Sequence, residues 1–391
     1  MENKKKFSKT SLALIIAFLS IIVFLTAWNA DRFVWMMQKD LPGITPNNAI
    51  WRTGSWNTSF TEYFRFKWIL VDTYGIFNLG IGKQSLDNFA LIKDENGIMQ
   101  KTQENFEKQE AIESIVAISD AFKERQIPVV FVSQPSRFTE ESFPLSNEIN
   151  FFGARDREYL SALSEGGVDI LEAEASGPVA LKTDMHLTTR AELDIAHQIA
   201  NRLIDMGIDY RNSDIIFDLG NYDSVTYPFY GNLVKSAGRY FTFGGDDFEL
   251  LYPRFETDLT MENLESGTVK SGDFRDSIMN GMEDNLEITR EPYWVLDYLA
   301  YPSAMCTVTN NMQEDGCNIL FVMDSVAMRT ASYLALGAWK ITVIDPRGEN
   351  GTELLIEEMK NGDYDAVIIE CGGEEFYFAI NFNDYDLSNQ G

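Results

Sequence analysis

The sequence predicts an α/β fold with a parallel central sheet, and two stretches carry that prediction. Residues 318–370 alternate between strand and helix patterns. The strands are expected at 318–324, 340–345 and 365–370, and the helices at 325–337 and 351–361. Short, unbroken apolar runs of this kind are typical of strands buried on both faces of a parallel sheet. Upstream, an amphipathic helix at 102–126 precedes an apolar strand at 128–133, which is a crossover pattern.

The middle of the chain continues the alternation of helices and strands up to residue 206 and then departs from it. A helix is expected at 155–164, a short strand at 168–170 and a third helix at 188–206, with Thr188 as its N-cap. Residues 207–305 are rich in Asp, Tyr, Phe and Gly and hold short alternating runs. We interpret them as a β/loop-rich insertion that caps the site. Residues 374–391 are acidic and polar, which indicates a loosely held tail.

The N-terminal region has the pattern of a membrane anchor. Residues 1–10 contain four lysines, and residues 11–28 carry no charge. The basic side stays in the cytoplasm, so the rest of the chain is expected outside a cell membrane that it crosses once. A cleaved secretory signal is the alternative. Residues 29–84 are rich in aromatic side chains, which suits a juxtamembrane segment.

The amino-acid composition argues against several classes of protein and of functional site. The 391 residues carry 60 acidic against 32 basic side chains and a formal charge of −28, which argues against a nucleic-acid partner. The three cysteines, Cys306, Cys317 and Cys371, do not form a zinc pattern. A Cys306–Cys317 disulfide and reduced thiols remain equal alternatives. The chain has no glycine-rich phosphate loop, and we expect neither a metal nor a cofactor.

The candidate catalytic residues are a serine, a histidine and an aspartate. Ser325 follows an apolar strand and Asp324 and begins a helix, which places its hydroxyl at the carboxyl end of the sheet, where α/β proteins bind ligands. His186 is one of only two histidines; the other, His197, lies at an apolar position of a helix. Asp184 stands two residues before His186, within reach of its imidazole. We assign Ser325 as nucleophile, His186 as base and Asp184 as its orienting partner.

These residues resemble a known family. Asp184-x-His186 followed by Thr188, with a later strand-Asp324-Ser325-helix, resembles the SGNH-hydrolase-like O-acetyltransferases of bacterial polysaccharide modification. That family includes the alginate O-acetyltransferase proteins and the DHHW family. The stretches PVVFVSQPSR at 128–137, NFALIKDENGIM at 88–99 and VIDPR at 343–347 add to the likeness, which covers roughly residues 85–370. Met323 replaces the family's usual Gly, and Met185 and Leu187 replace the second His and the Trp of Asp-His-His-Trp.

The resemblance implies both a fold and a reaction. The fold would be an SGNH-like three-layer sandwich in a catalytic domain at 85–373. The reaction would be O-acetylation of an exported or cell-surface polysaccharide through an acyl-enzyme. The acyl donor would be delivered by a membrane-bound O-acyltransferase partner. A carbohydrate esterase, or a non-catalytic polysaccharide-binding or scaffold protein of the cell envelope, are the alternatives.

Three further residues are candidates for holding substrate. In the wider hydrolase superfamily Gly and Asn supply oxyanion-hole donors, and Gly231 is followed here by Asn232. Arg137 follows the first strand, and Arg329 lies one helical turn after Ser325. Either guanidinium has the chemistry to bind a carboxylate or a sugar hydroxyl. An ordinary turn at Gly231 and structural ion pairs for both arginines are the alternatives.

Overall fold

The computed structural model describes residues 9–31, 67–86, 90–101, 108–137, 157–242, 244–279 and 304–371. The chain divides into two compact units, 1–76 and 77–391, which are described separately. The expected tail at 374–391 lies outside the described residues. Most of the aromatic segment at 29–84 lies outside them too. The domain boundaries given above therefore stay predictions.

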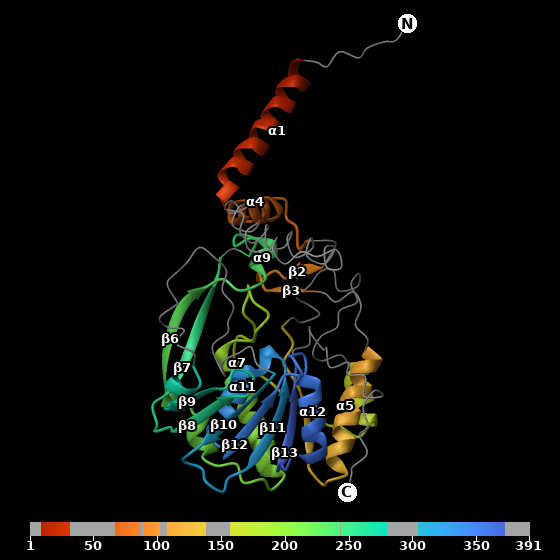
Figure 1. Ribbon diagram of the computed structural model, residues 1–391, viewed down its shortest axis with the longest axis vertical. Helices are drawn as coiled ribbons and strands as arrows, with labels where there is room; N and C mark the ends of the chain where they lie inside the picture. The colour runs from red at the N-terminus through yellow and green to blue at the C-terminus, as the bar shows by residue number, and fades with distance from the viewer. Residues whose placement is uncertain are drawn as a thin grey trace. The chain divides into compact units, whose positions relative to one another are not determined.

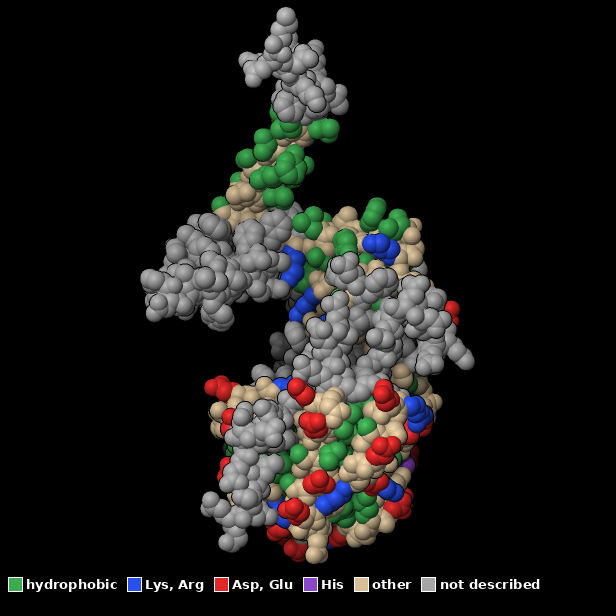
Figure 2. Space-filling model, turned by 90° about the vertical axis from the view of Figure 1, so that its right-hand side faces the viewer, with side chains coloured by type: hydrophobic (Ala, Val, Ile, Leu, Met, Phe, Trp, Pro, Cys, Tyr) green, Lys and Arg blue, Asp and Glu red, His purple; other side chains and the backbone are tan. Residues whose placement is uncertain are grey.

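The first unit contains one long helix, α1 (Lys9–Trp28). Its apolar side chains are exposed and cover the rod-like helix in Figure 2; Leu14 is 66% and Phe18 63% exposed. Within the described part of the chain, however, no helix reaches the length and apolar character needed to cross a membrane. The membrane anchor predicted at 11–28 is thus not found. A second helix, α4 (Lys67–Gly80), runs across the boundary between the units.

An eight-stranded mixed sheet forms the centre of the second unit (Figure 1). Its strands, in spatial order, are β5 (Asp169–Glu172), β4 (Val129–Ser133), β13 (Ala366–Glu370), β11 (Asn318–Met323), β12 (Lys340–Ile344), β10 (Met305–Asn310), β8 (Leu259–Asn263) and β9 (Thr268–Gly272). The five strands from β5 to β12 pair in parallel, and the last three pair antiparallel. The predicted parallel sheet is confirmed. All five residues of β4 and of β13 are buried, as their unbroken apolar runs predict.

Helices cover both faces of this sheet and create two separate cores. One face packs against α7 (Thr189–Asp205) and α11 (Met328–Leu334). The other packs against α5 (Lys108–Lys123), α6 (Arg157–Glu165) and α12 (Gly351–Asn361). Alternate residues of one strand enter different cores, so Phe321 of β11 faces α11 while Val322 faces α12. The result is the expected three-layer arrangement.

The segment at 207–305 contains strands and loops, and some of its strands join the central sheet, while its role as an insertion that caps the site stays a prediction. β8, β9 and β10 extend the central sheet by antiparallel pairing, and alternate residues of β8 are buried against the core. Only the ribbon of β6 (Tyr222–Phe229) and β7 (Asp246–Pro253) stands apart from the sheet. Four short helical turns connect these strands: α8 (Ser213–Ile216), η3 (Leu219–Asn221), α9 (Val234–Ala237) and α10 (Phe274–Ser277). Residues 280–303 lie outside the described part.

A small antiparallel sheet and three thiols complete the fold. The sheet comprises β1 (Ser85–Leu86), β2 (Leu91–Lys93) and β3 (Met99–Lys101). Cys306, Cys317 and Cys371 are all buried and free, so the structure has no Cys306–Cys317 disulfide. Burial raises the pKa of Cys306 to about 12, which keeps this thiol protonated and unreactive at neutral pH.

Candidate active site

Ser325 lies at the carboxyl end of β11, where the sequence places it. Asp324 caps the turn: its Oδ1 accepts the N–H of Val326 at 2.9 Å. A single 3-10 turn, η5 (Ser325–Ala327), then leads into α11. Met323 packs in the core, and no residue from 323 to 328 has positive φ, so this turn does not need glycine before Asp324. Ser325 is half-buried, and no other described residue hydrogen-bonds its hydroxyl or its N–H.

Asp184 and His186 form the predicted pair. The Nδ1 of His186 hydrogen-bonds Asp184 Oδ1, which also accepts the His186 N–H at 3.1 Å. Burial alone would raise the pKa of Asp184. The charge and hydrogen bond of His186, with the N–H of Asn232, instead hold that pKa well below its usual range. The carboxylate is therefore ionised. Because it binds Nδ1, the other ring nitrogen, Nε2, is the one left available for proton transfer. His186 Nε2 is buried and makes no hydrogen bond to the chain.

A second carboxylate, that of Asp246, binds the backbone directly before Asp184. Asp246, the first residue of β7, accepts the N–H of Lys182 at 2.5 Å and the N–H of Thr183 at 2.9 Å. It also accepts the Thr183 hydroxyl. Burial raises the pKa of Asp246, while the Thr183 hydroxyl and the N–H groups of Lys182 and Thr183 oppose that rise. Asp246 is only 9% exposed, whereas its neighbour Asp247 is exposed.

Gly231 has a positioning role and does not supply an oxyanion donor, which corrects its assignment. Its N–H is already donated to Thr183 Oγ1 at 2.8 Å. The next N–H, from Asn232, is donated to Asp184 Oδ2 at 2.7 Å. A Cβ on Gly231 would lie 2.5 Å from that same oxygen, so only glycine permits this approach.

Arg137 holds the loop that carries His186. Nη2 donates to the carbonyls of Met99, Leu181 and Asp184 at 2.8, 3.0 and 2.6 Å. Nη1 donates to the carbonyl of His186 at 3.1 Å. Four backbone carbonyls thus accept hydrogen bonds from this guanidinium, which gives Arg137 a role in positioning the loop. Its predicted role in binding substrate stays a prediction.

Arg329 of α11 also holds this loop. It is 2% exposed and forms two hydrogen bonds to Glu192 of α7, at 3.0 and 2.5 Å. Its Nη2 also donates to the carbonyl of Leu187 at 2.8 Å. Its guanidinium lies 5.3 Å from the ring centre of Phe248. The structural ion pair that the sequence left open is therefore the correct reading, and the pair is buried in the core.

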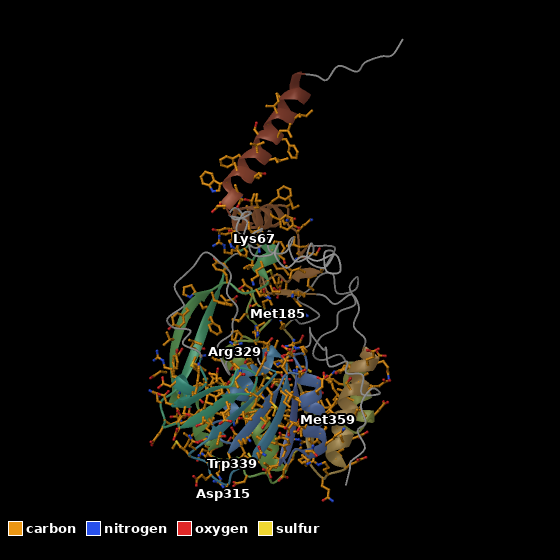
Figure 3. The ribbon with its side chains drawn as sticks, in the orientation of Figure 1. Lys67, Met185, Asp315, Arg329, Trp339 and Met359 are labelled. Carbon is orange, nitrogen blue, oxygen red and sulfur yellow. The ribbon has the colours of Figure 1, made fainter. Side chains whose placement is uncertain are left out.

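These contacts bring the two halves of the candidate triad to one edge of the sheet. Arg329 lies one helical turn after Ser325, and its hydrogen-bond acceptor, Leu187, follows His186 directly. Figure 3 labels Arg329 and Met185, the residue before His186, in this region. No hydrogen bond joins Ser325 and His186 themselves. Catalytic hydrogen bonds are often long without substrate, so the proximity agrees with the assignment and leaves it a prediction.

Glu370 is a buried acid that sequence reasoning missed. It ends β13 beside Asp324, has no exposed surface, and its Oε1 accepts Gln134 Nε2 at 2.7 Å. Thr330 of α11 donates to the same oxygen at 3.4 Å. Its Oε2 has no hydrogen-bond partner. A polar residue that ends a fully apolar strand was the signal that could have identified it.

His197, which the sequence places at an apolar position of its helix, is instead exposed. Its ring stacks on that of Phe217, with 4.9 Å between the ring centres.

Comparison with known proteins places the fold. No family model and no curated protein match the sequence. Among solved structures, PatB1 from Bacillus cereus with a sulfonyl adduct superposes with a TM-score of 0.55 at 14% identity, over 73% of this chain and 94% of PatB1. A DHHW family protein from Eubacterium siraeum gives 0.52 at 12% identity, over 75% of this chain and 92% of that protein. The chain shares their fold.

A third structure is more distant. The O-acetyltransferase domain of Pseudomonas putida AlgJ gives a TM-score of 0.43 at 11% identity, over 76% of this chain and 95% of that domain. The α/β fold implied by the resemblance to SGNH-like proteins is confirmed by the PatB1 and DHHW matches. The roles of Ser325, His186 and Asp184 stay predictions.

Proposed function

We propose that this protein is an extracytoplasmic O-acyltransferase that acetylates a polysaccharide through an acyl-enzyme on Ser325. One observation carries the proposal. Asp184 fixes the ring of His186, whose Nε2 is buried and makes no hydrogen bond. Arg329, one helical turn after Ser325, holds the loop that carries His186. A base whose proton-accepting atom is kept unoccupied suits proton transfer.

The chemistry follows in two half-reactions. His186 Nε2 takes the proton of the Ser325 hydroxyl as its oxygen attacks the carbonyl carbon of the acyl donor. The tetrahedral oxyanion accepts a hydrogen bond from the backbone N–H of Ser325. When this intermediate collapses, the alcohol of the donor leaves with the proton that His186 had taken. A sugar hydroxyl then attacks the ester while His186 removes its proton. Collapse of this second intermediate releases the acylated sugar and returns the proton to Ser325. Asp184 stays ionised and orients the ring throughout.

The partners in this proposal come from the family resemblance. The acceptor would be a cell-surface or exported polysaccharide, and a membrane-bound O-acyltransferase would deliver the acyl donor. The acidic side chains spread over the globular part in Figure 2 agree with an uncharged or cation-rich acceptor surface better than with a polyanion. The sequence pattern of a basic tail followed by a charge-free run at 11–28, which membrane anchors and secretory signals share, is what supports a site outside the cell membrane. A reporter enzyme fused at the C-terminus would test that location.

The experiment compares acyl transfer with hydrolysis. The full chain in detergent is given p-nitrophenyl acetate with and without neutral oligosaccharide acceptors, and acetylated sugar is detected by mass spectrometry. We expect sugar acetylation that Ser325→Ala lowers by about 10⁴-fold or more. A sulfonyl fluoride should modify the wild type at Ser325 and leave the variant unmodified. Acetate release that no acceptor diverts would instead identify an esterase, and failure of both reactions would favour a non-catalytic envelope protein.

A further inference from the structure

Two buried glutamates contact α11, the helix that follows the turn carrying Ser325, and only one of them is paired with an arginine. Adjacent residues of α11 contact them: Arg329 binds Glu192, and Thr330 hydrogen-bonds Glu370. Both carboxyl groups are fully buried. The two hydrogen bonds from Arg329 compensate the charge of Glu192. No basic side chain among the described residues forms an ion pair with Glu370.

The surroundings of Glu370 favour its neutral form. The charges that act most strongly on Glu370 are those of Glu192 on α7 and Asp324 after β11, the thiol of Cys371 is next to it in the chain, and each of these groups is acidic. Its polar neighbours, Gln134 and Thr330, hydrogen-bond only one of its two oxygens. A buried carboxylate with an unoccupied oxygen and acidic neighbours is far more costly than a neutral acid in the same place.

We propose that Glu370 is a positioning residue of this site: as a neutral carboxylic acid it ties Gln134, after β4, to Thr330 on α11, and so holds the turn that carries Ser325. This role rests on the proposed function only where activity is concerned. The position is suited to it, because β13 lies between β4 and β11 and Glu370 pairs in register with Met323, two residues before Ser325. Ionisation would put a second negative charge beside Asp324 and oppose an oxyanion forming on Ser325.

The pKa of Glu370 agrees with this geometry. Burial, with the charges of Glu192 and Asp324, raises it well above the ordinary range of a glutamate, against the hydrogen bond from Gln134. The unfolded chain ionises at its ordinary pKa, so the contribution of Glu370 to stability is fully present below that value. It is lost as the pH rises toward the native pKa. The folding equilibrium constant of the wild type should therefore fall by up to about tenfold per pH unit relative to a variant without this acid.

A set of matched variants separates the effect of a charge on Glu370 from the effect of its hydrogen bonds to Gln134 and Thr330. Glu370→Gln keeps the shape and a neutral group, Glu370→Leu removes both links, and Thr330→Val removes one partner while keeping the acid. Glu357→Gln, on the exposed face of α12, makes the same chemical change outside the cluster. Glu370→Gln should retain at least ten times the turnover of Glu370→Leu at pH 7, and Thr330→Val should fall between them. Above neutral pH, the wild type should lose turnover that Glu370→Gln does not lose.

The deciding experiment does not depend on activity. Infrared spectra of the full chain in detergent at pH 7 are compared for wild type and Glu370→Gln, and urea unfolding is followed from pH 5 to pH 9. We expect a protonated-acid carbonyl band that only Glu370→Gln removes, and a stability difference that grows with pH for this variant and not for Glu357→Gln. A carboxylate band at Glu370, or a flat difference, overturns the proposal. If these results hold while no variant transfers acyl groups, the proposed function fails and the neutral acid stands.

Discussion

Gly231 lies directly against the carboxylate of Asp184, and the two residues are 47 positions apart in the chain. A Cβ placed on Gly231 would stand 2.3 Å from the Cβ of Asp184 and 2.6 Å from the carbonyl oxygen of Thr183. Backbone and side chain both block that space, so neither neighbour can move aside cheaply. The orientation of the Asp184–His186 pair therefore depends on a glycine from a distant part of the chain.

Gly231→Ala should test this dependence. We expect the free energy of unfolding to fall by about 1–3 kcal/mol, because an overpacked core residue forces its neighbours to shift. Turnover should fall by roughly 100-fold, since Asp184 and His186 move out of alignment. Urea unfolding and p-nitrophenyl acetate turnover measure the two effects. Gly177→Ala is the control, because nothing lies within 4 Å of that site; equal effects of both substitutions would contradict the argument.

Asp184→Asn should separate orientation from packing at the same site. The amide keeps the shape of the carboxylate, but it favours the wrong tautomer of His186, and we expect turnover to fall by about 10⁴-fold. Circular dichroism should show an unchanged fold. The exposed Asp223→Asn serves as control and should leave turnover within about twofold of wild type. Full activity in Asp184→Asn would remove Asp184 from the triad.

The ionised state of Asp184 also predicts how stability depends on pH. The pKa of Asp184 is held below its unfolded value of about 3.9, so this carboxylate stabilises the native state above that value. The contribution disappears as the pH falls through the lower native pKa. Asp184→Asn should therefore be less stable than wild type at pH 7, and the difference should shrink below about pH 4. Urea midpoints at pH 7, 5 and 3 measure it; a constant difference would show that the charge does not matter.

Local patterns explain which features the sequence predicted. The spacing of Asp184 and His186 sets their reach, Thr188 caps α7 by accepting the N–H of Ala191 at 3.2 Å, and α12 has the predicted bounds. Each depends on residues within a few positions of one another. The turn at Ser325 also follows from a strand, a polar pair and a helix in succession.

Long-range contacts explain which features it did not predict. Arg329 donates to the carbonyl of Leu187, 142 positions away, and Asp246 accepts the N–H of Thr183 across 63 positions. Two arginines beside a site look the same in sequence whether they bind substrate or backbone carbonyls. Likewise, an alternating run such as β8 suits a cap as well as an edge of the central sheet, and only its pairing with β10 decides between them.

Arg137 offers a kinetic test of its positioning role. Arg137→Met removes four hydrogen bonds to the loop from Leu181 to His186 and to Met99. We expect kcat to fall by about 100-fold, because the base loses its alignment, while KM for donor and acceptor stays within about threefold. Steady-state kinetics with both substrates would measure this split. A raised KM with unchanged kcat would return Arg137 to a substrate-binding role.

The buried pair of Arg329 and Glu192 predicts strong coupling between two substitutions. Arg329→Met alone leaves a buried carboxylate without its cation, and Glu192→Leu alone leaves a buried guanidinium, so each should cost about 3–5 kcal/mol. Burial raises the pKa of Glu192 and Arg329 opposes that rise, so loss of the arginine should protonate Glu192. The double variant should recover much of the loss, since no charge stays buried. The exposed Arg157–Glu172 pair should give less than about 1 kcal/mol in the same cycle. Urea unfolding of the four variants in each cycle measures the coupling, and additive effects at Arg329 and Glu192 would show that they do not act as a pair.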